Sequence, residues 1–566
     1  MTSYSFRIQR CVWMWICMMG VVTSLQAQNP SEQVMPVTGT YAITGAYVVP
    51  APGQVIAGGT VLIQDGLIVE VGTSVKIPGH ARIIQADSMY VYAGFIDGFS
   101  HAGIPKPKEP SRSERPKVKN PGTPPDNLAG IMPQRQVRDL MDPKDKSIAE
   151  LRAAGFTAAH IAPHGKMLPG QSAFILTDGS HADEMIYQAQ SGLYARFQGA
   201  SGMYPNTVIG VMAKFRDLYR SAEGLKQHEV QYASSAVGMA RPPQNQVLQA
   251  FFPVIDQSLP VFFETPKLLD AHRAMALQRD LGFPLVLAGL EQGGDLIPQL
   301  SNGEFPVILS LELPDEVDEE DAPNSGKASV NEERDQLFKR KLEAYEQYVS
   351  QAGKFAQANI PFAFSTAGVK TKEIRKNLQV MVEYGLDEAT ALAALTTVPA
   401  ELMGVSDVMG TLEAGKMANV IVTTQPFLAQ KSQVKYVWVD GHFHEYEAKK
   451  KKKSAVSPDA PVEAAGLWSF TVESPQGTVN GTLKLSGSEG DYEGTISTDM
   501  SPDENTLESI ELEGNILTFS YSLSMGGDQA SVDGELELDG DTFEGTLSVG
   551  NFGSFPIEGT REGGPQ

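Results

Sequence analysis

Between residues 94 and 402 the sequence alternates short apolar runs with stretches of helical spacing. Along one such stretch, apolar residues recur every three or four positions from Phe338 to Val349, as on one face of a helix. Roughly 300 residues of repeated βα units fit a (β/α)8 barrel, or TIM barrel, which typically needs about 250 residues. We therefore predict an α/β fold with this barrel over 94–402. The clearest strand-like runs are Thr157 to His160, Pro260 to Phe263, Pro284 to Ala288, Phe305 to Leu311 and Pro361 to Phe364.

Two segments of short alternating strands flank the barrel region, at 38–93 and 403–446. The first contains Asp65-Gly66, a favoured two-residue hairpin turn. A chain of 566 residues exceeds what one hydrophobic core supports, so additional domains are expected. We predict that the two segments form one composite β-sandwich that the barrel splits.

The residues from 447 onward differ in composition from the rest. Residues 447–465 carry a lysine run, Lys449 to Lys453, and then Pro, Ser and Ala, which is typical of a solvated linker. From 466 to 563, turn glycines precede short alternating strands, as in Gly481-Thr482-Leu483. This pattern predicts a C-terminal all-β domain that resembles lipocalin-like β modules.

The first 27 residues have the pattern of a secretory signal peptide. Arg7 and Arg10 precede an apolar run from Cys11 to Val22 that is shorter than the roughly 20 residues needed to span a bilayer. We expect export to the periplasm or the extracellular space, with no membrane span after cleavage. Because both cysteines lie in this segment, the mature chain would have no disulfide and no thiolate metal site.

The formal net charge of −23 argues against nucleic-acid partners, because a negative surface repels phosphates.

Two polar stretches interrupt the barrel region. Residues 104–125 are rich in proline, lysine and arginine, and residues 314–334 are strongly acidic. We predict solvated loops for both, although a basic loop beside an active-site mouth could bind an anionic substrate.

Residues Ala93 to His101 read Ala-Gly-Phe-Ile-Asp-Gly-Phe-Ser-His. This run resembles the amidohydrolase superfamily signature Pro-Gly-Phe-Ile-Asp-X-His-X-His, with Phe99 in place of the first histidine. In the complete signature the two imidazoles leave one face of a strand and bind the same metal ion. His101 keeps the second position, whereas a phenyl ring has no lone pair to donate.

A second run, Gly410 to Asn419, resembles the return-strand motif Gly-X-Leu-X-X-Gly-Lys-X-Ala-Asp of the imidazolonepropionase-like branch, with Asn419 at the usual aspartate. The same run is close to a phosphate loop, but Met417 replaces the required Ser or Thr and β structure follows. We therefore reject a nucleotide site. The resemblance covers most of 41–446.

The resemblance implies one or two divalent metals, such as zinc, in the barrel mouth. It also implies a base that takes a proton from the metal-bound water. At the matching strand ends Glu264 replaces a histidine, Glu291 stands where members carry Glu or His, and Ala367 replaces the proton-accepting aspartate. Lys214 lies in a helical run and is a poor bridging ligand. One imidazole and one or two carboxylates fall short of the three protein ligands usual for catalytic zinc, so the metal site is expected to be degenerate.

A remodelled site is the alternative. His160 and His164 lie at and after the end of a predicted strand, followed by a loop containing Pro169-Gly170-Gln171. With His101, Glu264 and Glu291 they could form another metal site, although histidines near strand ends are more often packing residues. A nucleophile at Ser100 is disfavoured, because neighbouring strand residues point to opposite faces.

Two functions follow from these residues and the resemblance. The first is an exported hydrolase that acts on C–N bonds of small amides, cyclic amides or dipeptides by water attack. Its catalytic residues are not assigned, and a divalent metal is its one candidate cofactor. The second is a catalytically inactive amidohydrolase-fold protein that binds a small-molecule ligand or acts as a scaffold.

Overall fold

A computed structural model describes residues 39–107, 118–301, 303, 305–317, 332–446 and, with short gaps, 464–561. The chain forms two compact units, Met1–Ala448 and Lys449–Gln566. The predicted signal peptide and most of the predicted linker lie outside the described residues.

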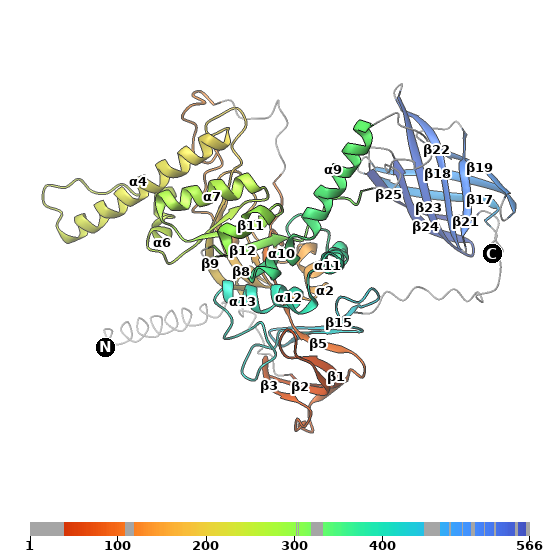
Figure 1. The fold of residues 1–566 in the computed structure, drawn as a ribbon, viewed down its shortest axis with the longest axis horizontal. Coiled ribbons are helices and arrows are strands. Elements are labelled where there is room, and N and C mark those ends of the chain that lie inside the picture. Colours follow the sequence, from red (N-terminus) through yellow and green to blue (C-terminus); the bar gives the residue numbers. More distant parts are fainter. Residues whose placement is uncertain are drawn as a thin grey trace, which may run out of the picture. The chain divides into compact units, whose positions relative to one another are not determined.

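The two flanking β segments meet in one eight-stranded sheet of the first unit (Figure 1). The connection is made by β5, which runs parallel to β1 and antiparallel to β14. The turn between β2 and β3 has positive φ at both Asp65 (50°) and Gly66 (81°), as a primed hairpin turn requires. The strands are β1 Thr40–Val49, β2 Ile56–Gln64, β3 Leu67–Gly72, β4 Arg82–Gln85, β5 Tyr90–Ala93, β14 Val420–Thr423, β15 Val434–Val439 and β16 His442–Glu445.

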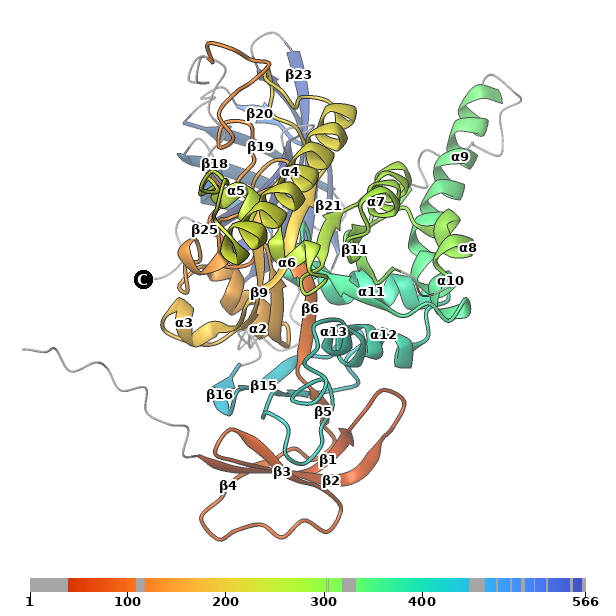
Figure 2. The same ribbon diagram turned by 90° about the vertical axis from the view of Figure 1, so that its left-hand side faces the viewer.

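Gly94 alone separates β5 from the first strand of a closed eight-stranded barrel, so the sheet leads directly into it (Figure 2). The barrel closes where Ser365 of β13 pairs with Phe99 of β6. Its strands are β6 Phe95–Ser100, β7 Phe156–Ile161, β8 Gly170–Leu176, β9 Ile186–Arg196, β10 Val261–Glu264, β11 Leu285–Leu290, β12 Val307–Ser310 and β13 Phe362–Ser365.

The prediction of eight repeated βα units is wrong at β8, which runs antiparallel to both β7 and β9. Only residues 162–169 and 177–185 connect it to these neighbours. A parallel crossover needs about a dozen residues or more, whereas an antiparallel return can be short. Gly170 and Gln171, expected in a loop, therefore begin a barrel strand.

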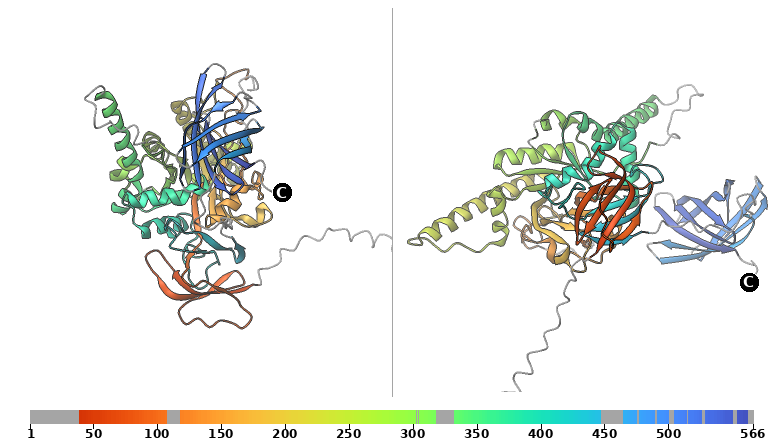
Figure 3. Two further views of the ribbon diagram at one scale, coloured as in Figure 1. Left: turned by 90° about the vertical axis from the view of Figure 1, so that its right-hand side faces the viewer. Right: turned by 90° about the horizontal axis from the view of Figure 1, so that it is seen from below.

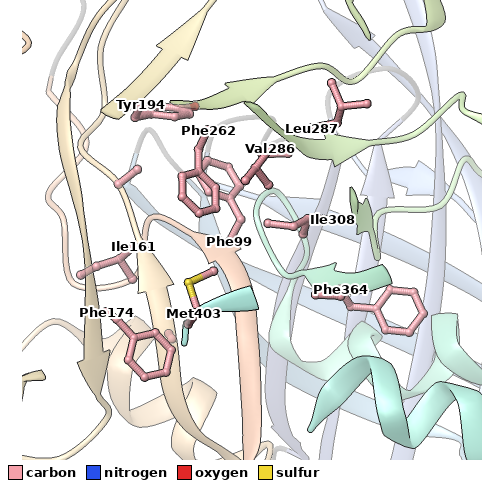
Figure 4. Close-up of a cluster of buried hydrophobic side chains, with 14 of the residues drawn as sticks. Phe99, Ile161, Phe174, Tyr194, Phe262, Val286, Leu287, Ile308, Phe364 and Met403 are labelled. Atoms are coloured by element: carbon pink, nitrogen blue, oxygen red, sulfur yellow. The ribbon is translucent and has the colours of Figure 1, made fainter. Parts of the chain in front are cut away.

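Apolar side chains fill the barrel interior, and Phe99 lies among them with Phe262 and Ile308 (Figure 4). The long helix α4 extends away from the barrel (Figure 1). None of the described helices is long and apolar enough to cross a membrane. The helices are α2 Lys146–Ala153, α3 Ala182–Met185, α4 Val208–Ser234, α5 Gln246–Gln249, α6 Phe252–Ile255, α7 Leu268–Leu281, α8 Ile297–Leu300, α9 Glu332–Val349, α10 Gln351–Gln357, α11 Ile374–Glu383, α12 Glu388–Leu395 and α13 Thr397–Leu402, with 3-10 turns η1 Val137–Asp139, η2 Gly294–Leu296 and η4 Thr371–Glu373.

The second unit is a coiled, nearly closed antiparallel sheet of nine strands (Figure 3). Its interior holds Trp468, Phe519 and other apolar side chains. Glycine at position 559 leaves space for the ring of Phe543, because a Cβ at this position would lie only 2.4 Å from that ring. The strands are β17 Gly466–Ser474, β18 Gly477–Ser488, β19 Asp491–Thr498, β20 Asn505–Thr506, β21 Glu508–Glu513, β22 Ile516–Met525, β23 Asp528–Asp539, β24 Thr542–Val549 and β25 Gly553–Arg561.

Candidate active site

Asp97 joins the first and last strands of the barrel. Its Oδ1 accepts hydrogen bonds from the backbone N–H groups of Phe99 and Thr366, each at 3.1 Å, and its Oδ2 accepts from the Thr366 hydroxyl. Complete burial raises the pKa of Asp97 to about 7, although these hydrogen bonds act in the opposite direction. Asp97 therefore fixes the strand ends that form the barrel mouth.

Phe99 is a packing residue in this mouth. Its side chain is 2% exposed, and its ring lies 5.4 Å from the His101 ring and 5.2 Å from the Tyr194 ring, centre to centre. Its carbonyl accepts a 2.7 Å hydrogen bond from the Ser365 hydroxyl. The position that resembles a metal-ligand histidine thus contributes apolar contacts.

His101 and His164 form a pair of imidazoles with ring centres 4.2 Å apart. His101 Nδ1 lies 2.7 Å from the Ala162 carbonyl oxygen, which can only accept, so Nδ1 carries the proton and Nε2 the lone pair. Burial lowers the pKa of each histidine to about 4. Both are therefore neutral at pH 7, and His101 presents a basic nitrogen at the carboxyl end of β6.

His160 lies deeper in the barrel, apart from that imidazole pair. It is completely buried, its Nδ1 is 3.1 Å from the Gly98 carbonyl oxygen, and its ring centre is 4.1 Å from that of Phe262. Burial lowers its pKa to about 3. Its buried Nε2 has no hydrogen-bond partner among the described residues.

Glu264 is held by two side chains from the neighbouring strand. Arg196 is its register partner on β9 and forms an ion pair with both carboxylate oxygens. The Tyr194 hydroxyl donates to Glu264 Oε2 at 2.7 Å. Neither Arg196 nor Tyr194 was predicted from the sequence; both lie among the last three residues of β9. These bonds occupy the carboxylate that was predicted as a metal ligand.

Glu291 and Ala367 lie at other strand ends of the mouth. Burial, and then the charge of Glu312, raise the pKa of Glu291, while a hydrogen bond with the Tyr348 hydroxyl lowers it. Ala367 offers no acid, but the carboxylate of Glu312 lies over Gly368, where an added Cβ would be 2.3 Å from Oε2. Glu312 is thus a carboxylate at the mouth that the sequence motifs did not reveal.

The donors in this mouth do not fit the metal centre that the signature implies. Across the part of the chain that the structure describes, no group of three or more His, Cys, Asp or Glu residues could hold a metal ion. Glu264 pairs with Arg196 instead, and Phe99 is apolar. We therefore derive no catalytic step through a metal.

Comparison with known proteins identifies the class of this fold. The model of the amidohydrolase family matches residues 336–443. Amidohydrolase tasK of Hapsidospora irregularis is 22% identical over 425 residues, which are 68% of this chain and 40% of that protein. The chain thus spans less than half the length of that relative.

A crystal structure of an amidohydrolase from Thermotoga maritima MSB8 has a similar fold, with a TM-score of 0.57 and 19% identity over 71% of this chain and 99% of that one. The family match over residues 336–443 and this likeness of fold relate the chain to the amidohydrolase superfamily.

Proposed function

We propose that this protein hydrolyses C–N bonds in small amides, cyclic amides or dipeptides, as a member of the imidazolonepropionase-like branch with a degenerate metal site. The observation that carries the proposal is His101, a neutral imidazole with its lone pair on Nε2 at the barrel mouth. Active sites of such barrels gather at the carboxyl ends of the strands. The family match supports the reaction class.

The proposed chemistry uses His101 as general base. Its Nε2 takes a proton from water while the water oxygen attacks the amide carbon, and the imidazolium then returns the proton to the leaving nitrogen. The charge of Arg196 contributes, after burial, to the lowered pKa of His101. A base with a pKa of about 4 accepts protons weakly, and we expect slow turnover.

A second function, ligand binding without catalysis, is favoured by the ion pair between Glu264 and Arg196, which occupies one of the predicted metal ligands. We also propose that the chain is exported, on the strength of the signal-like pattern in residues 1–27. Both functions are compatible with export.

A hydrolysis screen over dipeptides and cyclic amides, with metal analysis of the same sample, tests the proposal. We expect turnover that survives chelation and is lost in His101→Ala. His80→Ala, which changes an exposed histidine of the same unit, is the matched control. Turnover lost on chelation would refute the metal-independent mechanism, and absence of any turnover would favour the binding protein.

A further inference from the structure

A cavity of about 900 Å³ opens at the barrel mouth, where the segments that follow β11 and β12 face helices α9 and α10. This volume is within the usual range for small-molecule sites. We propose that the cavity binds an organic ammonium ion, a small ligand with a protonated amine on an apolar or aromatic body. The walls combine carboxylates with two tyrosines: Glu291, Asp295, Asp315, Glu316, Tyr345 and Tyr348.

The charge of the lining favours a cation. Four carboxylates line the cavity against two lysines, Lys341 and Lys354. Glu291 is half-buried, and among the described residues it forms no ion pair, only the hydrogen bond with Tyr348. Glu312 adds a further negative charge close to it. An ammonium group would compensate these charges and donate hydrogen bonds to Glu291.

Tyr345 and Tyr348 add aromatic walls to the carboxylates. The side chain of Tyr345 is 8% exposed, and both tyrosines line the cavity. The faces of tyrosine rings also attract cations, which distinguishes an organic ammonium ion from a purely polar ligand.

This inference goes beyond the proposed hydrolysis, because a binding protein without catalysis could use the same cavity. The sequence motif suggested a metal at Glu291, so a metal ion is the competing ligand. The tyrosine walls and the absence of a ligand group of three donors among the described residues favour the organic cation.

Calorimetric titration of the full chain with phenethylamine and with 2-phenylethanol tests the proposal. At pH 7 the amine is protonated and the alcohol is its neutral counterpart. We expect the amine to bind at least about tenfold more tightly, because its charge meets the Glu291 carboxylate and the tyrosine rings. Glu291→Gln, which keeps the size of the side chain, should remove most of this preference.

Two further variants sharpen the test. Tyr345→Leu removes the aromatic ring, and it should weaken amine binding severalfold. Glu401→Gln, an exposed glutamate outside the cavity, should change nothing. Ellipticity at 222 nm checks that each variant is folded. Equal affinities for the two probes, no saturable amine binding, or an unchanged preference in Glu291→Gln would overturn the proposal. Zinc alone binding in a Glu291-dependent way, without amine binding, would also overturn it.

Discussion

Acid should destabilise the barrel through His160. This imidazole is completely buried and its pKa falls from 6.5 in the unfolded chain to about 3. The folded state therefore favours the neutral ring, so this contribution to stability is present above pH 6.5 and is lost as the pH falls towards 3. At pH 4.5 the unfolded chain is protonated and the folded chain is not, which costs about 3 kcal/mol at 1.36 kcal/mol per pH unit.

The perturbation that tests this is His160→Asn. The amide can still donate to the Gly98 carbonyl, as Nδ1 does in the parent. We expect the variant to lose stability at pH 7, because a smaller side chain leaves a cavity. Between pH 7 and pH 4.5, however, it should lose about 3 kcal/mol less than the parent, because it has no buried group to protonate.

Urea unfolding followed at 222 nm measures this difference. All described helices lie between Val137 and Leu402, so their ellipticity reports on the barrel. His101 and His164 titrate in parent and variant alike, so their contributions cancel in the comparison. His80→Asn, at an exposed site, is the control. An equal loss of stability in the parent and His160→Asn between the two pH values would refute the argument.

Two further predictions concern the strand ends beside the site. Thr366→Val removes the hydroxyl that donates to buried Asp97 and should lower the free energy of unfolding by about 1–3 kcal/mol, which Thr366→Ser should largely restore. A parent-like urea midpoint for Thr366→Val would contradict this role. Gly94→Ala places a Cβ 2.1 Å from Thr157 Oγ1, so we expect a loss of about 1–3 kcal/mol in thermal or urea unfolding. At exposed Gly224 on α4, where a Cβ meets nothing within 4 Å, alanine should instead stabilise the protein by roughly 0.5–1 kcal/mol. Equal effects at the two glycines would count against the packing argument.

Local patterns predicted much of the architecture. The Asp65-Gly66 pair predicted a hairpin turn, and the apolar runs from Thr157 to Phe364 predicted five of the barrel strands. These features depend on residues near one another in the sequence, so their patterns can be recognised without the fold. The direction of β8 was missed, because its short connections carry no distinctive motif.

The sequence by itself determined the strand-rich character of the C-terminal unit and the apolar residue at position 99. Only the tertiary structure decided which side chains pair with one another at the barrel mouth. Arg196 and Glu264 are 68 positions apart in the chain, and they pair because β9 and β10 lie side by side in register. The cavity that Glu291 and Tyr345 line likewise forms between segments that are distant in sequence. Side-chain pairing and burial across a closed barrel depend on strand register and closure, which no local pattern encodes.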